Sequence, residues 1–231
     1  ELQHERYRSL RRTLRDTAKA RHDFRHQLLV IRSFADEDDV QGLRAYLDEQ
    51  GAGQAQREPG AYALNFALDA VAAHFAERAR ACGADVSLAF ALPERLPLPE
   101  ADFCMAMANL LENAVEACER AVREEAGADG RGSTAQDGAR PLFVDAEARI
   151  EGNAVLVSVR NSCTPSDARA LAAAAPDGVL SSDVRSAKRE GDGIGLASVA
   201  TLAKRYRGEV QVEIDEYAAT IHVLLFAGDA R

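Results

Sequence analysis

The sequence predicts an α+β protein in two parts: a helical hairpin, and then a two-layer sandwich of helices packed on a mixed sheet. Three observations support this prediction. Apolar residues recur at alternating steps of three and four over residues 10–35, as in a helical bundle. Residues 51–60 are small, polar and broken by Pro59, which is the composition of a linker. Beyond the linker, helical patterns alternate with short runs of period two, which indicates helices on one face of a sheet.

The hairpin is expected to occupy residues 1–52. The positions of its seam are Leu10, Leu14, Thr17, Arg21, Phe24, Leu28, Ile31 and Ala35, of which Thr17 and Arg21 are polar and weaken it. Asp38 or Asp39 is expected to cap a second helix, which carries Val40, Leu43, Tyr46 and Leu47. Because this seam is narrow, the hairpin needs a partner, and we expect a homodimer whose two hairpins form a four-helix bundle.

The second domain is expected to occupy residues 60–231. The predicted elements are a helix over 64–79, a strand over 86–92, a helix over 101–125, a strand hairpin over 142–150 and 154–161, a helix over 196–206, and a second strand hairpin over 209–215 and 219–226. Residues 127–138 have the composition of a long loop. Residues 162–190 lack steady periodicity, which is typical of a lid over a ligand and equally of an ordinary surface loop.

Composition restricts the class of protein. The chain has 231 residues, of which 47% are hydrophobic and 28% charged, enough for one real core with some helical extension. Its net charge of -9 argues against a nucleic-acid partner. The four cysteines show no Cys-x-x-Cys spacing, so reduced thiols are expected. No apolar stretch has the length of a membrane span, and the chain begins with Glu1, which favours a fragment of a longer protein.

Two motifs point to a nucleotide. In Asn109-Leu-Leu-Glu-Asn113-Ala, two carboxamides lie one helical turn apart and can offer oxygen atoms to Mg²⁺. In Gly191-Asp-Gly193-Ile-Gly195-Leu196, a glycine-rich turn opens a helix and presents backbone N–H groups to phosphate. Taken singly, the first motif is also compatible with a structural polar cluster and the second with a plain tight turn. The turn is not a P-loop, because no Gly-Lys-Ser/Thr follows.

These motifs resemble the N box and the second glycine box of the GHKL ATPase superfamily, to which gyrase, MutL and histidine kinases belong. Upstream, Arg21-His22-Asp23-Phe24-Arg25-His26 is similar to the phospho-acceptor box of sensor histidine kinases that include the peptide quorum-sensing receptors of Gram-positive bacteria. The resemblance implies that ATP and Mg²⁺ are bound between the two boxes. The binding residues it implies are Asn109, Asn113, Gly193, Ile194, Gly195 and Leu196, with Asn113 as the metal ligand. Lys188 and Arg189 come just before the glycines, where they are placed to reach a terminal phosphate and equally to be solvated charges of the preceding segment.

The first glycine box of that superfamily, Asp-x-Gly-x-Gly, is missing. Asn161 stands at the position of the Asp that binds the adenine amino group in the superfamily. The side-chain oxygen of Asn161 can still accept a hydrogen bond from an exocyclic amine, but its nitrogen can also donate. The selectivity for adenine is therefore open from the sequence.

The resemblance makes His22 the residue that accepts the phosphoryl group. An unperturbed imidazole is largely neutral at cellular pH, and Asp23 can accept from its other ring nitrogen, which fixes the tautomer. Gln27 follows Asp23 by four positions and, like His26, is a candidate for orienting water during dephosphorylation of a partner. The implied partner is the receiver domain of a response regulator. The chain would then be the cytoplasmic portion of a membrane sensor whose upstream sensor region is absent here.

Two other classes of protein remain to be weighed. An ATP-hydrolysing clamp of the gyrase or MutL type should carry a Glu as the base for water where this chain has Asn109, so this residue favours transfer to a side chain. A non-catalytic histidine phosphotransfer or scaffold module would keep the hairpin and lose nucleotide binding. Asn161 in place of the usual Asp leaves that second class open. A nucleotide titration decides it, because such a module would not bind nucleotide.

Overall fold

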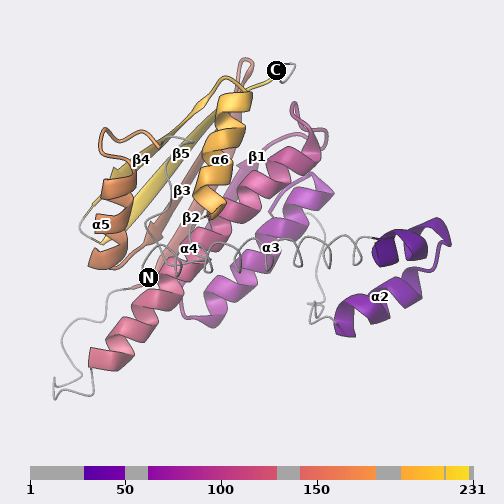
Figure 1. Ribbon diagram of the computed structural model, residues 1–231, viewed down its shortest axis with the longest axis horizontal. Helices are drawn as coiled ribbons and strands as arrows, with labels where there is room; N and C mark the ends of the chain where they lie inside the picture. Colours follow the sequence, from indigo (N-terminus) through magenta and orange to yellow (C-terminus); the bar gives the residue numbers. More distant parts are fainter. Residues whose placement is uncertain (1–28, 50–61, 129–140, 181–193, 216, 229–231) are drawn as a thin grey trace, which may run out of the picture. The chain divides into compact units, whose positions relative to one another are not determined.

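The computed structural model describes residues 29–49, 62–128, 141–180, 194–215 and 217–228 (Figure 1). The chain divides into two compact units, Glu1–Arg57 and Glu58–Arg231, and each is considered by itself. Several residues named above lie outside the described ranges: His22, Asp23, His26, Gln27, Lys188 and Gly193. Their roles stay predictions.

In the first unit, residues 29–36 are helical and are followed by α2, Val40–Glu49, which confirms the expected second helix. The turn between them places Asp38 at a φ of 54°. Asp39 is the capping residue of the two that were considered, because its Oδ1 accepts a hydrogen bond from the Gly42 N–H at 2.8 Å. The rings of Phe34 and Tyr46 pack across the turn with centroids 5.9 Å apart. The four-helix bundle and the homodimer stay predictions.

The second unit contains four helices and five strands in its described part. They are α3 Phe66–Ala81, β1 Asp85–Ala91, α4 Glu100–Ala128, β2 Phe143–Glu151, β3 Ala154–Ser162, α5 Pro165–Ala174, α6 Ile194–Arg205, β4 Glu209–Ile214 and β5 Ala218–Phe226. All of the helices and strands expected from the sequence in this unit are confirmed, with boundaries that shift by one to three residues. Helix α4 runs further than expected, into the segment that was interpreted as a loop.

Helix α5 corrects the interpretation of residues 162–190 as a segment without regular structure. Its residues are mostly small, so it carries no apolar stripe that periodicity could detect. The helix is instead specified at its start, where Thr164 and Asp167 form a capping box and Pro165 occupies the first turn. The interpretation as an irregular segment is therefore wrong for the part that forms α5, and the role of the segment as a lid stays a prediction.

The sheet is mixed, with the strand order β1-β2-β3-β5-β4. β1 pairs with β2 in parallel, and α4 lies between them in the chain. The two predicted hairpins, β2–β3 and β4–β5, are antiparallel and therefore confirmed. At one edge, residues 178–180 pair with β4 through hydrogen bonds from Leu180 N to Val210 O at 2.9 Å and from Val212 N to Gly178 O at 2.7 Å.

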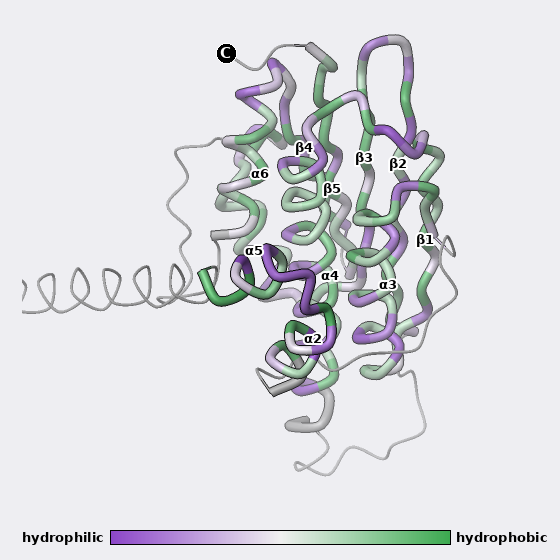
Figure 2. The backbone as a smooth tube through the Cα atoms, turned by 90° about the vertical axis from the view of Figure 1, so that its right-hand side faces the viewer, coloured by the Kyte–Doolittle hydropathy of each residue, from purple (hydrophilic) through white to green (hydrophobic). Residues whose placement is uncertain are grey.

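Helices α3, α4 and α6 cover one face of the sheet, and α5 lies beside β4 (Figure 1). The core lies between these helices and the sheet, where alternate side chains of β3 and β5 are buried, among them Val157, Val159 and Ile221. Hydrophobic residues recur along both strands and helices (Figure 2). Gly208 comes so close to the backbone of Leu224 that a Cβ would overlap the Leu224 carbonyl oxygen. No helix in the described ranges is long and apolar enough to cross a membrane.

Candidate functional site

The two asparagines of the Asn109–Asn113 pair lie half-buried on α4. The side-chain nitrogen of Asn113, Nδ2, donates a hydrogen bond to the backbone carbonyl of Asn109 at 2.6 Å. Because this nitrogen is engaged, the oxygen Oδ1 is the atom of the amide that can take a metal ion. The hydrogen bond thus fixes which end of the Asn113 amide is turned to the backbone of α4.

Helix α6 begins at Ile194, and its second residue, Gly195, faces this pair. A Cβ added to Gly195 would lie 3.0 Å from Asn113 Nδ2 and 3.6 Å from the Asn109 Cβ. A Cβ at this position would press on the end of the Asn113 side chain, so glycine allows the closest approach. The N-terminal end of α6, with the N–H groups of its first turn and its positive dipole, lies beside the two amides. The first turn of α6 and the asparagine pair form one site, although more than eighty positions separate them in the sequence.

The opposite end of α6 is fixed to α4 by a polar cluster. Tyr206, which follows the helix, donates its hydroxyl proton to Asp102 Oδ2 at 2.6 Å, and Arg205 Nη1 lies 3.0 Å from the same oxygen. Burial and the hydrogen bond to Asp102 raise the pKa of Tyr206, so its hydroxyl keeps its proton at neutral pH. Leu196, in the first turn, packs against the main core. These contacts set the position of α6 along α4. The backbone of Ile194 is described by the structure, but its side chain is not.

Asn161 lies near the end of β3 on the face covered by helices, and it is only 5% exposed. Its register partners are Val144 and Ala219. Ala219 packs with Ala117 of α4, which lies one turn beyond Asn113. Asn161 therefore lies beside α4, about one turn further along the helix than the Asn109–Asn113 pair.

The Asn161 amide is also oriented by its neighbours. Its Nδ2 donates to the Ser162 carbonyl at 2.8 Å, which leaves Oδ1 as the atom that can accept a hydrogen bond from a ligand. The sequence left open whether this side chain would accept or donate. In the structure the Nδ2 group is engaged by the Ser162 carbonyl, and Oδ1 is the acceptor end of the amide.

Helix α5 closes this region and was missed at the sequence level. Ala168 and Leu171 of α5 pack on the small cluster of Ala117, Cys163 and Ala219. Burial, and to a lesser extent Asp167, raises the pKa of Cys163 to about 11, so the thiol is neutral at physiological pH. The sequence signal that could have located α5 is the spacing Thr-x-x-Asp at residues 164–167, which is typical of a helix start.

One ion pair joins α5 to α4. Arg120 Nε lies 2.9 Å from Asp167 Oδ1, and the Asp167 side chain is 8% exposed. Arg120 is on the same face of α4 as Asn113, two turns further along. Sequence reasoning did not identify Arg120, because its partner lies 47 positions away.

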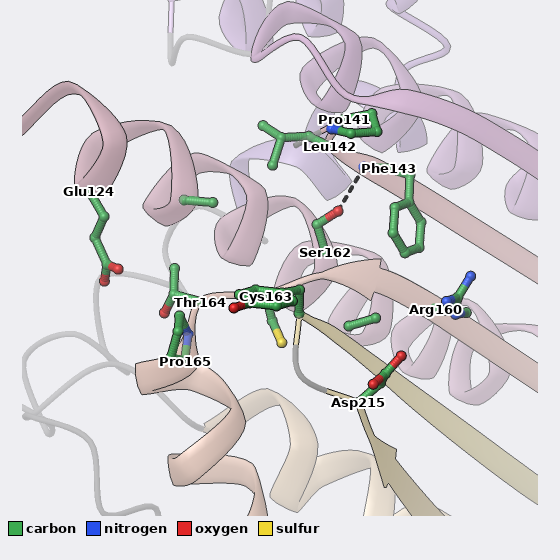
Figure 3. A pocket seen from close by; sticks show the side chains of 13 residues that line it. Glu124, Pro141, Leu142, Phe143, Arg160, Ser162, Cys163, Thr164, Pro165 and Asp215 are labelled. Atoms are coloured by element: carbon green, nitrogen blue, oxygen red, sulfur yellow. Dashed lines mark hydrogen bonds between the residues drawn. The ribbon is translucent and has the colours of Figure 1, made fainter. Parts of the chain in front are cut away.

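A separate cavity of about 590 Å³ is lined in part by the turn that follows β3, residues 163–165 (Figure 3). Glu124 lies on one side of it, and Arg160 and Asp215 on the other. The guanidinium of Arg160 is 4.8 Å from the centre of the Phe143 ring. No residue of the predicted nucleotide site lines this cavity, so it is distinct from the region between α4 and α6.

Neither a family model nor a curated protein matches the chain. The solved structures that it resembles include histidine kinases. The catalytic domain of the histidine kinase ThkA is 15% identical over 70% of this chain and 90% of that chain, with a TM-score of 0.44. A histidine kinase from Burkholderia phymatum is 21% identical over 90% of this chain and 89% of that chain, with a TM-score of 0.46.

Full-length ShkA in complex with AMPPNP is 22% identical, with a TM-score of 0.43. The match covers 71% of this chain and 30% of the ShkA chain. Because identities and TM-scores are this low, the functional proposal depends on the residues and geometry of the chain itself.

Proposed function

We propose that this chain comprises the ATP-binding domain and the phospho-acceptor hairpin of a sensor histidine kinase of a two-component system. The observation that carries the proposal is the approach of Gly195, at the start of α6, to Asn109 and Asn113 of α4. It supports a site in which the phosphates of ATP meet the N–H groups of α6, while the base reaches Asn161.

The residues present fit a magnesium ion held jointly by protein and nucleotide. The described residues contain no group of three or more His, Cys, Asp or Glu side chains that could hold a metal by themselves. Asn113 supplies one amide oxygen, and Mg²⁺ commonly completes its shell with phosphate oxygens and water. When bound, the ion neutralises charge on the transferring phosphoryl group.

In the proposed reaction, a neutral ring nitrogen of His22 attacks the γ-phosphorus of ATP. A bond from nitrogen to phosphorus forms, the bond from phosphorus to the bridging oxygen breaks, and ADP leaves. Asp23 accepts a hydrogen bond from the other ring nitrogen and stabilises the charge that develops. The phosphoryl group then passes to an aspartate on a response regulator receiver domain. The chain acts as a homodimer at the cytoplasmic side of a membrane sensor.

The test is incubation of the whole chain with γ-labelled ATP and Mg²⁺, followed by mapping of the label. Acid-labile label is expected on His22, and His22→Ala should abolish labelling while the affinity for ATP is unchanged. His74→Ala is a matched control, because His74 is an exposed histidine on α3. Full labelling of the His22→Ala variant, or label on His26, would refute the assignment. Absence of both ATP binding and label in the unmodified chain would favour the non-catalytic module.

A further inference from the structure

The Arg120–Asp167 ion pair spans from α4 to α5 at the end of the region where Asn161 lies. Both partners are largely withdrawn from water, with side chains 25% and 8% exposed. A second carboxylate, Glu116, lies 3.5 Å from Arg120 Nη1, and its side chain is 32% exposed. Removing one member of such a pair leaves the other charge poorly compensated, so the contact constrains α5 strongly.

Asp167 also forms hydrogen bonds to the turn that follows β3. Its Oδ2 accepts hydrogen bonds from Thr164 N at 3.3 Å and from Thr164 Oγ1 at 3.1 Å, while its own N–H donates to Thr164 Oγ1 at 3.2 Å. Between Asn161 and Thr164, Cys163 N donates to Tyr217 O at 2.9 Å. The backbone that holds Asn161 is therefore fixed from both sides.

We infer that Arg120 is a positioning residue that sets which base the nucleotide site accepts. The inference rests on the proposed function. Through Asp167 and Thr164, Arg120 holds the turn that begins directly after Ser162, the last residue of β3, whose carbonyl accepts the hydrogen bond from Asn161 Nδ2. Asn161 then presents Oδ1, an acceptor, which suits the 6-amino group of adenine and opposes the 6-oxo group of hypoxanthine.

If the turn loosens, the Asn161 amide can rotate and present its NH₂ group instead, because its two ends have similar size. A carboxylate at this position would be an acceptor in either orientation. An asparagine needs its orientation imposed, which gives the ion pair a role beyond stability.

A second ion pair on α4 serves as a control that separates the proposed role in selecting the base from a role in stability. Arg78 of α3 binds Glu119 of α4 through Nε–Oε1 at 2.8 Å and Nη2–Oε2 at 3.1 Å, with side chains 35% and 27% exposed. This pair joins α3 to α4, and in the described part of the chain none of its hydrogen bonds involves a residue of the turn after β3. Arg78→Met therefore measures what the loss of a similar ion pair does to stability alone.

The experiment compares equilibrium dissociation constants for Mg-ATP and Mg-ITP, which differ at the 6-position of the base, using the whole chain. The unmodified protein should prefer ATP. Arg120→Met should reduce the ITP-to-ATP ratio of dissociation constants by about fivefold, the value of one ordinary hydrogen bond. Arg120→Lys should recover part of the ratio, and Arg78→Met should leave it unchanged. Should Arg120→Met not fold, Asp167→Asn takes its place with the same expectation.

An unchanged ratio in a folded Arg120→Met variant would overturn the inference, as would an equal change in Arg78→Met. Equal binding of ATP and ITP by the unmodified chain would also overturn it, while leaving the proposed kinase function intact. Absence of binding of either nucleotide would contradict the proposed function and the inference with it.

Discussion

A single methyl group added at Gly195 is expected to separate nucleotide binding from stability. The Cβ of Gly195→Ala would lie 3.0 Å from Asn113 Nδ2, so the Asn113 side chain must move away from α6. The backbone of α6 itself gains from the change, because alanine is favoured over glycine in a helix by about 0.5–1 kcal/mol. The variant should therefore unfold at the same temperature as the unmodified protein or slightly above it.

The loss in binding can be estimated from the contact that is displaced. A hydrogen bond or ligand contact to a charged group is worth about 1.5–3 kcal/mol, which corresponds to a loss of affinity for Mg-ATP of about tenfold to a hundredfold. Calorimetric titration measures the affinity, and circular dichroism on heating measures the stability. Gly228→Ala is the control, because a Cβ at Gly228 meets no atom within 4 Å. Unchanged affinity in Gly195→Ala would refute the site.

Three further results are expected. Asn113→Ala should remove the Mg²⁺ dependence of ATP binding, because the amide oxygen proposed to hold the ion is lost. ATP titrations with and without Mg²⁺ measure this dependence, and its persistence in the variant would contradict the proposed role of Asn113. Gly208→Ala should lower the free energy of unfolding in urea by about 3 kcal/mol, since the new Cβ overlaps the Leu224 carbonyl oxygen; a smaller loss than in Gly228→Ala would be inconsistent with that overlap. Burial raises the pKa of Cys118 from 9.0 to about 12, so the folded protein keeps this proton at pH values where the unfolded chain loses it. The free energy of unfolding should therefore be unaffected by this thiol below about pH 9 and should fall by about 1.4 kcal/mol per pH unit as the pH rises toward 12. Cys118→Ala should flatten this alkaline slope, and an unchanged slope would exclude the assignment.

The elements that the sequence predicted are those specified by nearby residues. The hairpin of β2 and β3 was predictable because two alternating runs flank Gly152, whose φ of 62° suits a tight turn. The α4 helix was predictable from its sustained apolar period. Helix α5 was not, because its residues are small and only its capping box marks it.

Contacts between distant parts of the chain were harder to predict. The approach of Gly195 to Asn113 was anticipated only through the resemblance of two motifs, since no local pattern relates α6 to α4. The parallel pairing of β1 with β2 depends on the chain passing through α4 between them. The bond from Arg120 to Asp167 joins residues 47 positions apart, and neither carries a signal for the other.

The pairing of residues 178–180 with β4 has a consequence for self-association. An uncovered edge strand exposes a row of N–H and C=O groups that can recruit the edge of another molecule. The bonds of Gly178 and Leu180 occupy two of these groups on β4, the carbonyl of Val210 and the N–H of Val212, and interrupt that row. At the other end of the strand order lies β1, which Pro93 follows closely. The chain thus limits aggregation at the β4 edge of the sheet, because residues 178–180 pair with that strand.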